Sequence, residues 1–257
     1  MSTRIVGEVR AAYRASCLAL VTLAQLGAVE AHQRVSSTSR REAVFDRHMR
    51  QWVRTLLRVF GVRLLIDGVV PASTSASRMI VSNHRSPIDI AVVLSLFGGQ
   101  VLSRADLADW PIIGTAARKA GTIFVDRSES ASGAQAIRQM RRRFQSGATI
   151  SVFPEGTTFA GDEVRPFRMG AFVGIRGVDL DVVPVGIAYE DGSEFVDETF
   201  LAHLRRSAKR SSTPVAVSVG EPRKVEGKTA DFGQLIHADV QQLVYRARRV
   251  LQKSLQR

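Results

Sequence analysis

The sequence predicts an α/β domain with a largely parallel central sheet flanked by helices. Short apolar runs rich in β-branched residues alternate with segments of helical periodicity. The chain has 257 residues, a length that suits one domain with a sizeable core. Polar motifs follow directly after several of the apolar runs. Parallel sheets gather their ligand sites at such strand ends, so these motifs are the first candidates for a site.

The predicted domain spans residues 63–257 and contains seven strand candidates. Each candidate is short, apolar and bounded by turn or polar residues. These strands are expected at 63–68, 78–83, 100–104, 121–126, 148–154, 181–189 and 214–220. Helical patterns lie at 87–97, 110–119, 130–146 and 170–176, and a last helix at 231–257 carries five cations after Tyr245.

Residues 1–62 are predicted to form a helical segment that associates with a membrane. Its charge-free run, 15–29, is shorter than the roughly 20 apolar residues that cross a bilayer. A buried core helix would fit this run as well. Arginines on both sides favour a helix that lies in one leaflet and enters and leaves on the same face; they are Arg4, Arg10, Arg14, Arg34, Arg40 and Arg41.

The segment 45–60 has the pattern of a basic amphipathic helix. Its apolar residues recur at helical spacing, and four arginines lie on its other faces. A core-packed helix with a solvated face would show the same pattern. Residues 1–67 hold eleven arginines against five acidic residues, which is half of the chain's net charge of +12. This concentration of charge favours an anchor on anionic phospholipid.

Composition excludes several other classes of protein. A net charge of +12 implies an anionic partner, but aromatic residues are only 7% of the chain and no basic stripe is interleaved with them. We therefore expect no nucleic-acid partner. Cys17 is the single cysteine, so no internal disulfide can form, and the histidines lack HxxxH or HExxH spacing. No metal site is expected.

The stretch 83–89, Asn-His-Arg-Ser-Pro-Ile-Asp, allows two interpretations. Ser86 can cap a helix that begins at Pro87, with Asp89 favourably placed in its first turn. Alternatively, the reversing chain brings the Asp89 carboxylate beside one ring nitrogen of His84. A histidine oriented in this way can act as a general base toward an alcohol. The capping interpretation leaves His84 unexplained.

Four motifs in order resemble those of the glycerolipid acyltransferases, typified by 1-acyl-glycerol-3-phosphate (lysophosphatidic acid) acyltransferases. The first is His84 to Asp89, a histidine and an aspartate separated by four residues. The second is "GTIFVDR", which ends at Arg127. The third is "FPEGT" at 153–157, followed by "RPFRMGAF", and the fourth is "VVPVGI" at 182–187. Together they span roughly residues 63–222.

The resemblance implies that His84 deprotonates an acceptor hydroxyl and that Asp89 orients it. It implies that Arg127 and Arg168 hold a phosphate, that Glu155 contacts the glycerol part, and that Gly156 and Thr157 complete the substrate-binding loop. The expected reaction moves a fatty acyl group from acyl-CoA or acyl-carrier protein to 1-acyl-glycerol-3-phosphate, giving phosphatidic acid. Acyl-CoA or the carrier protein is a co-substrate, and no cofactor is expected. The expected location is the cytoplasmic face of a bacterial inner membrane, with monotopic or peripheral attachment.

One departure keeps the acceptor open. The family's third motif often carries a basic residue where this chain has Thr158. Another lyso-phospholipid, glycerol 3-phosphate or lyso-ornithine lipid therefore remains an alternative acceptor. A noncatalytic module that binds anionic lipid or nucleic acid is the alternative from another class, but it would leave "FPEGT" unexplained.

Overall fold

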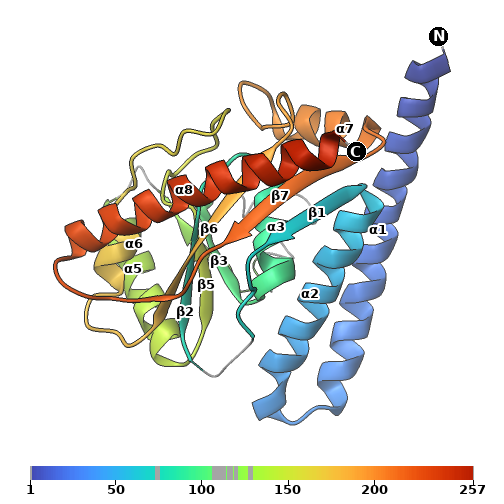
Figure 1. Cartoon of the computed structure of the whole chain (residues 1–257). Coiled ribbons are helices and arrows are strands. Elements are labelled where there is room, and N and C mark those ends of the chain that lie inside the picture. Colours follow the sequence, from blue (N-terminus) through green and yellow to red (C-terminus); the bar gives the residue numbers. More distant parts are fainter. Residues whose placement is uncertain are drawn as a thin grey trace.

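The computed structural model describes residues 2–72, 76–105, 114, 118, 121–126 and 130–256. Over these residues the chain forms an eight-stranded sheet between two layers of helices, with a long helical hairpin against one side (Figure 1). The predicted α/β class with a mostly parallel sheet is confirmed.

The strands follow the order β1-β7-β6-β2-β5-β3-β4, and β8 also pairs with β6. Neighbours are parallel except that β7 and β8 each run antiparallel to β6. The carboxyl ends of β6, β2 and β5 therefore lie side by side at one end of the sheet. The strands are β1 Val62–Asp67, β2 Arg78–Ser82, β3 Gln100–Arg104, β4 Ile123–Val125, β5 Thr149–Val152, β6 Asp181–Tyr189, β7 Thr213–Val219 and β8 Arg223–Lys224.

The helices match the predicted ones with some differences. The first helix is much longer than the run 15–29. Helix α7 was not predicted, nor was the short strand β8. The helix expected at 110–119 lies almost wholly outside the described residues. The helices are α1 Ser2–Val35, a short 3₁₀ turn Thr38–Arg40, α2 Arg41–Val59, α3 Ile88–Phe97, α5 Ser130–Gln145, α6 Gly170–Gly174, α7 Phe200–Lys209 and α8 Thr229–Leu255.

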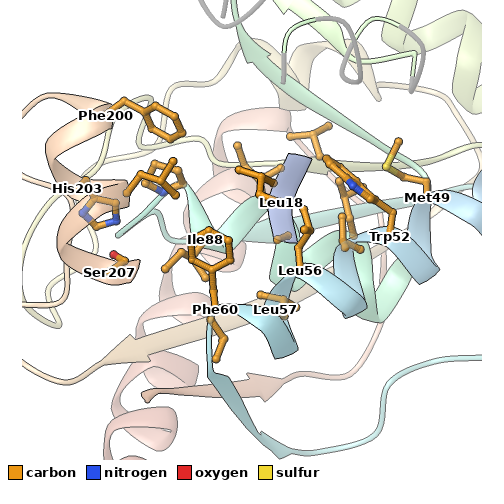
Figure 2. Close-up of a pocket in the computed structure, with 18 of the residues that line it drawn as sticks. Leu18, Met49, Trp52, Leu56, Leu57, Phe60, Ile88, Phe200, His203 and Ser207 are labelled. Carbon is orange, nitrogen blue, oxygen red and sulfur yellow. The ribbon is translucent and has the colours of Figure 1, made fainter. Parts of the chain in front are cut away.

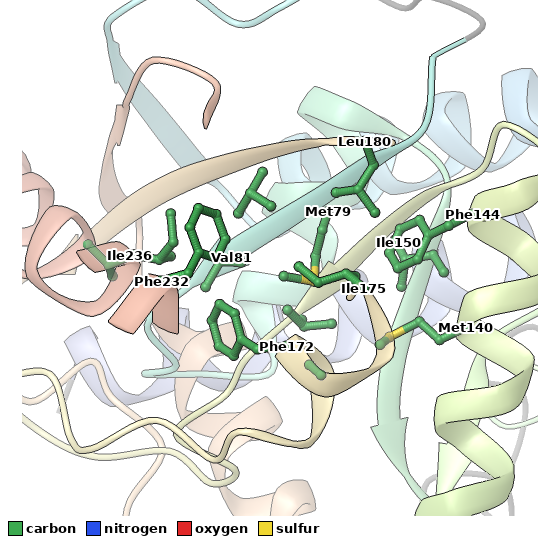
Figure 3. Close-up of a cluster of buried hydrophobic side chains, with 14 of the residues drawn as sticks. Met79, Val81, Met140, Phe144, Ile150, Phe172, Ile175, Leu180, Phe232 and Ile236 are labelled. Carbon is green, nitrogen blue, oxygen red and sulfur yellow. The ribbon is translucent and has the colours of Figure 1, made fainter. Parts of the chain in front are cut away.

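Both faces of the sheet are buried, which explains why the sequences of the central strands are continuous apolar runs. In β2, Met79 and Val81 point into a cluster beneath α5, α6 and α8 (Figure 3), whereas Ile80 points into the cluster beneath α2 and α3. The alternation follows from the two-residue period of a strand. Helix α8 crosses β6 at Gly186, where a Cβ would lie 2.2 Å from the backbone of Leu243.

Helices α1 and α2 form the hairpin at the amino-terminal end of the chain. By length and composition α1 could cross a membrane, and only 11% of its most apolar window is buried inside the protein. Trp52 on α2 donates to Thr22 Oγ1 on α1 at 3.1 Å. One face of α1 leaves large apolar side chains exposed, among them Ile5, Val9, Leu20 and Leu23.

Arg14 joins α1 to the end of α7. Its guanidinium is buried and donates to the carbonyl oxygens of Ala208 at 3.1 Å and Arg210 at 2.6 Å. A helix carries its negative end at the carboxyl terminus, and its last carbonyls lack partners within the helix. Arg14 therefore satisfies these acceptors and complements the helix charge together, which explains why an arginine is tolerated in the contact between α1 and α7.

We predict that Arg14→Leu lowers the free energy of unfolding by about 2–3 kcal/mol, because it leaves buried carbonyls without a donor. Denaturant unfolding in detergent micelles measures this change. The matched control is Arg34→Leu on the same helix, whose ion pair with Glu30 is exposed and should matter little. Equal effects of the two variants would contradict the capping role of Arg14.

Candidate active site

The candidate site is built on the loop that follows β2. Asn83, the first residue of that loop, is fully buried, and its side-chain amide donates to Ile187 O and accepts from Ile187 N, both at 2.8 Å. The side chain thus replaces one step of the ladder between β2 and β6. This pairing lets the main chain turn away from the sheet immediately after the strand.

His84 and Asp89 meet across this turn. His84 Nδ1 lies 2.8 Å from Asp89 Oδ2, and the imidazole stacks on Phe153, with ring centroids 4.3 Å apart. A carboxylate can only accept a hydrogen bond, so Nδ1 carries a proton and the neutral ring has its lone pair on Nε2. The His84 side chain is 17% exposed, and no described residue forms a hydrogen bond to Nε2. The ring therefore presents a free base toward the surface.

The Asp89 carboxylate is fully buried and held by several donors. Its Oδ2 also accepts from the amides of Arg85 at 2.6 Å and Ser86 at 2.8 Å, and its Oδ1 accepts from Tyr189 Oη at 2.7 Å. Burial, together with the charge of Asp89, raises the pKa of Tyr189 well above its usual range, so the phenol stays a donor. These bonds compensate the desolvation of the carboxylate and fix its direction.

Glu155 lies beneath the same loop and is also buried. Its carboxylate pairs with Arg85 at 3.0 Å and accepts from His84 N at 2.5 Å and Arg165 N at 2.8 Å. A contact between Glu155 and the glycerol part of an acceptor stays a prediction, and in this structure the side chain is buried and bonded within the protein. Its bonds instead tie the end of β5 to the loop after β2.

The other predicted substrate-binding residues lie on or beside the loop after β5. Gly156 has φ +85°, and a Cβ there would lie 2.7 Å from Arg168 Nε, so glycine permits both the turn and the close approach of Arg168. Thr157 and Arg168 are exposed. Arg127 lies outside the described residues. The loop thus places Gly156 and Arg168 together on the carboxyl side of the sheet.

Two cavities lie near the histidine loop, and His84 itself lines neither of them. The larger, about 200 Å³, is almost entirely apolar and lies between α2, α3 and α7, with Leu18 of α1 at its side (Figure 2). Pro87 and Ile88, at the start of α3, line it. The second, about 160 Å³, is lined by Phe153, Pro154, Gly156 and Arg168 and lies on the other side of β3 and β5. Ser103 borders both cavities.

This arrangement can deprotonate a hydroxyl group. Asp89 keeps the proton on Nδ1 of His84 and stabilises the imidazolium that forms when Nε2 takes up another proton. Among the described residues, no group of three or more His, Cys, Asp or Glu side chains could hold a metal ion. The apolar cavity, which Pro87 and Ile88 of the same loop line, provides a place for a hydrocarbon chain.

Several residues of the site were not singled out from the sequence. Tyr189 contacts Asp89 and Arg85 contacts Glu155. The two residues of each pair are distant along the chain, so the sequence gives no sign of either contact. The helix that carries His203 was missed, although Thr199 signals its start as an N-cap that accepts from Ala202 N at 3.2 Å.

The fold places a histidine, held by a carboxylate, at the end of a parallel strand. Proteins of known family that resemble this chain identify the class of enzyme to which this arrangement belongs. A family model described as Acyltransferase matches residues 68–188. The lyso-ornithine lipid O-acyltransferase of Pseudomonas aeruginosa is 30% identical over 190 residues, which cover 71% of this chain and 72% of that protein. The chain belongs to the acyltransferase family, as its four motifs predict.

Two further proteins are similar to this chain. The 1-acyl-sn-glycerol-3-phosphate acyltransferase of Neisseria meningitidis is 24% identical over 144 residues, which cover 56% of this chain and 51% of that protein. The crystal structure of PlsC, the 1-acyl-sn-glycerophosphate acyltransferase of Thermotoga maritima, matches with a TM-score of 0.75 at 17% identity. The match covers 96% of this chain and 98% of that one, and it shows that the fold is shared.

We predict that Glu155→Gln lowers the free energy of unfolding by about 3–5 kcal/mol, because it leaves the buried Arg85 guanidinium without its counter-charge. Thermal and denaturant unfolding measure the change. The control is Glu163→Gln, whose side chain is exposed on the same loop. A Glu155→Gln protein of unchanged stability but weakened acceptor binding would instead support the substrate-contact role.

Proposed function

We propose that the chain transfers a fatty acyl group from a thioester, acyl-CoA or acyl-carrier protein, to the free hydroxyl of a lyso-lipid. Nε2 of His84 takes the hydroxyl proton while the oxygen attacks the thioester carbonyl. The new C–O bond replaces the C–S bond, and the proton passes to the departing thiolate. Neither a cofactor nor an acyl-enzyme intermediate is needed.

The placement of the histidine carries this proposal. His84 Nε2 is unpaired within the described residues, while Nδ1 is fixed by a fully buried carboxylate. The loop that holds the pair continues into Pro87 and Ile88, which line the apolar cavity. An acyl chain in this cavity would bring its carbonyl toward the base, and Arg168 at the second cavity offers a cation to the polar part of an acceptor.

Lyso-ornithine lipid is the acceptor that the observations favour. The relatives from Pseudomonas aeruginosa and Brucella abortus, 30% and 29% identical, are both named lyso-ornithine lipid O-acyltransferases. Thr158, where the family's motif often has a basic residue, donates its hydroxyl to Phe195 O at 2.6 Å and supplies no charge. 1-Acyl-glycerol-3-phosphate is the second candidate, because Arg168 is exposed beside Gly156 and Arg127 follows β4 in the sequence.

The amino-terminal hairpin is proposed to hold the protein on the membrane in which the lyso-lipid resides. The exposed apolar side chains of α1 face outward from the hairpin, and arginines line α2. Each basic residue near an anionic surface adds about 1 kcal/mol of attraction. We propose monotopic or peripheral attachment to the cytoplasmic face of a bacterial inner membrane.

His84→Ala should lower the rate of acyl transfer at least about a hundredfold, since it removes the general base. Asp89→Asn should lower the rate as well, because an amide can donate to Nδ1 and stabilise the wrong tautomer. Purified protein with labelled acyl-CoA or acyl-carrier protein and a mixture of lyso-lipids provides the assay, and mass spectrometry identifies the product.

His32→Ala serves as the control because this histidine lies in the hairpin, where it contacts His48. Full activity of His84→Ala in a correctly folded protein would refute the base assignment.

Acceptor choice is tested with lyso-ornithine lipid and 1-acyl-glycerol-3-phosphate supplied separately. We expect faster turnover of the lyso-ornithine lipid. Arg168→Ala should raise KM for 1-acyl-glycerol-3-phosphate more than for lyso-ornithine lipid, because a guanidinium forms bidentate hydrogen bonds with a phosphate group. Arg176→Ala is the exposed control on the neighbouring segment. Product formed only from the phosphate-bearing acceptor would reverse the preference.

A further inference from the structure

A second histidine, His203, contacts the catalytic loop at Ser86. His203 lies on α7, beyond the end of the family match at residue 188, and it is only 2% exposed. Its Nε2 lies 2.9 Å from Ser86 Oγ, and its Nδ1 lies 2.8 Å from Glu198 Oε1. Glu198, His203 and Ser86 therefore form a connected chain that ends inside the 83–89 loop.

The direction of each hydrogen bond follows from the partners. A carboxylate only accepts, so Glu198 requires the proton on Nδ1 of His203 and leaves Nε2 as an acceptor. Ser86 Oγ accepts from Ile88 N at 3.2 Å and can donate its own proton to Nε2. Arg206 Nη2 donates to the same Glu198 oxygen at 2.5 Å and lies 3.1 Å from His203 Nδ1. Because a guanidinium only donates, it forms no hydrogen bond with a protonated Nδ1, and Glu198 Oε1 accepts from both groups.

Burial lowers the pKa of His203, although the contact with Glu198 opposes this shift. A neutral ring fits the assigned pattern, because a neutral ring protonated on Nδ1 accepts at Nε2.

The three side chains resemble the order of a nucleophilic triad, but Ser86 is not placed to attack a substrate. Its side chain is fully buried, it does not line either cavity, and its oxygen is engaged by the Ile88 amide. The chain instead ends at the residue that orients the catalytic pair: Ser86 N is one of the amides that hold Asp89 Oδ2, at 2.8 Å.

We infer that Glu198 and His203 are positioning residues, which act through Ser86 to hold the first turn of α3 and thereby the Asp89–His84 pair. This inference rests on the proposed acyl transfer. His203 also lines the apolar cavity (Figure 2), so α7 connects the wall of that cavity to the catalytic loop. The main chain strengthens the link, because Phe195 N donates to Arg85 O at 2.8 Å.

The principal test compares variants of His203 by kcat and KM. His203→Phe keeps a ring in the cavity wall but removes both polar contacts. We expect kcat to fall about tenfold to a hundredfold, the loss that follows small misplacement of a catalytic group, with KM for the acyl donor nearly unchanged. His203→Gln, whose amide oxygen can accept from Ser86, should recover part of the rate. Glu198→Gln provides a second route to the same loss if His203→Phe does not fold.

Two controls separate positioning from packing. Leu201→Ala alters an exposed side chain of α7 that does not line the cavity, and His237→Phe replaces another partly buried histidine away from the loop. Both should retain kcat. The inference is overturned if His203→Phe keeps the wild-type kcat, or if it changes only KM for the acyl donor. Trapping of an acyl group on Ser86 would also overturn it, because Ser86 would then be a nucleophile.

A readout without turnover distinguishes this inference from the proposed function. Nitrogen-15 NMR of the histidine rings should show neutral His203 protonated on Nδ1, and the His84 ring signals should shift in His203→Phe but not in His237→Phe. If the wild-type protein acylates no acceptor yet these signals behave as stated, only the proposed function fails. A His203 ring protonated on Nε2 alone, or unmoved His84 signals, contradicts the positioning role itself.

Discussion

The carboxylate of Asp89 is removed from water and must be satisfied by the protein, and the organisation of the site follows from this requirement. Its oxygens accept from one imidazole, two amides of its own loop and the phenol of Tyr189. An unpaired buried carboxylate would be very costly, so the loop, the start of α3 and the end of β6 have to lie where they do. The orientation of His84 is a consequence of satisfying that charge.

The sheet order explains how distant residues reach this carboxylate. Strands β6, β2 and β5 are adjacent and parallel, so Tyr189, the His84 loop and Glu155 emerge at the same end of the sheet. A second buried pair, Glu155 with Arg85, fixes the loop from below. His84 is thus held by two separate charged networks, one that orients its ring and one that holds its main chain.

The sequence predicts the parts of the site that are local. His84 and Asp89 are five positions apart across a strand-to-helix turn, so their contact needs only a correct prediction of the local structure. The burial of Glu155 could not be predicted in this way, because its partner Arg85 is separated from it by 70 residues and either residue alone looks like a solvated charge. His203 was missed for the same reason, and α7 itself is short and follows an irregular segment.

The amino-terminal segment shows a similar limit. The charge-free run 15–29 indicated a helix, but the helix extends from Ser2 to Val35. Two of the flanking arginines, Arg10 and Arg14, donate to carbonyl oxygens at the end of α7. Arg14 caps α7 from within α1. The same contact joins the amino-terminal hairpin to the helix that borders the apolar cavity, so the hairpin and the wall of that cavity share one support.

The central claim is that His84, oriented by Asp89, takes the proton from the acceptor hydroxyl. A crystal structure with a lyso-lipid and a thioether analogue of the acyl donor tests it most directly. We expect the acceptor hydroxyl within about 2.6–3.2 Å of His84 Nε2 and the acyl chain in the cavity between α2, α3 and α7. A hydroxyl bound out of reach of that nitrogen, with the acyl chain outside the cavity, would contradict it.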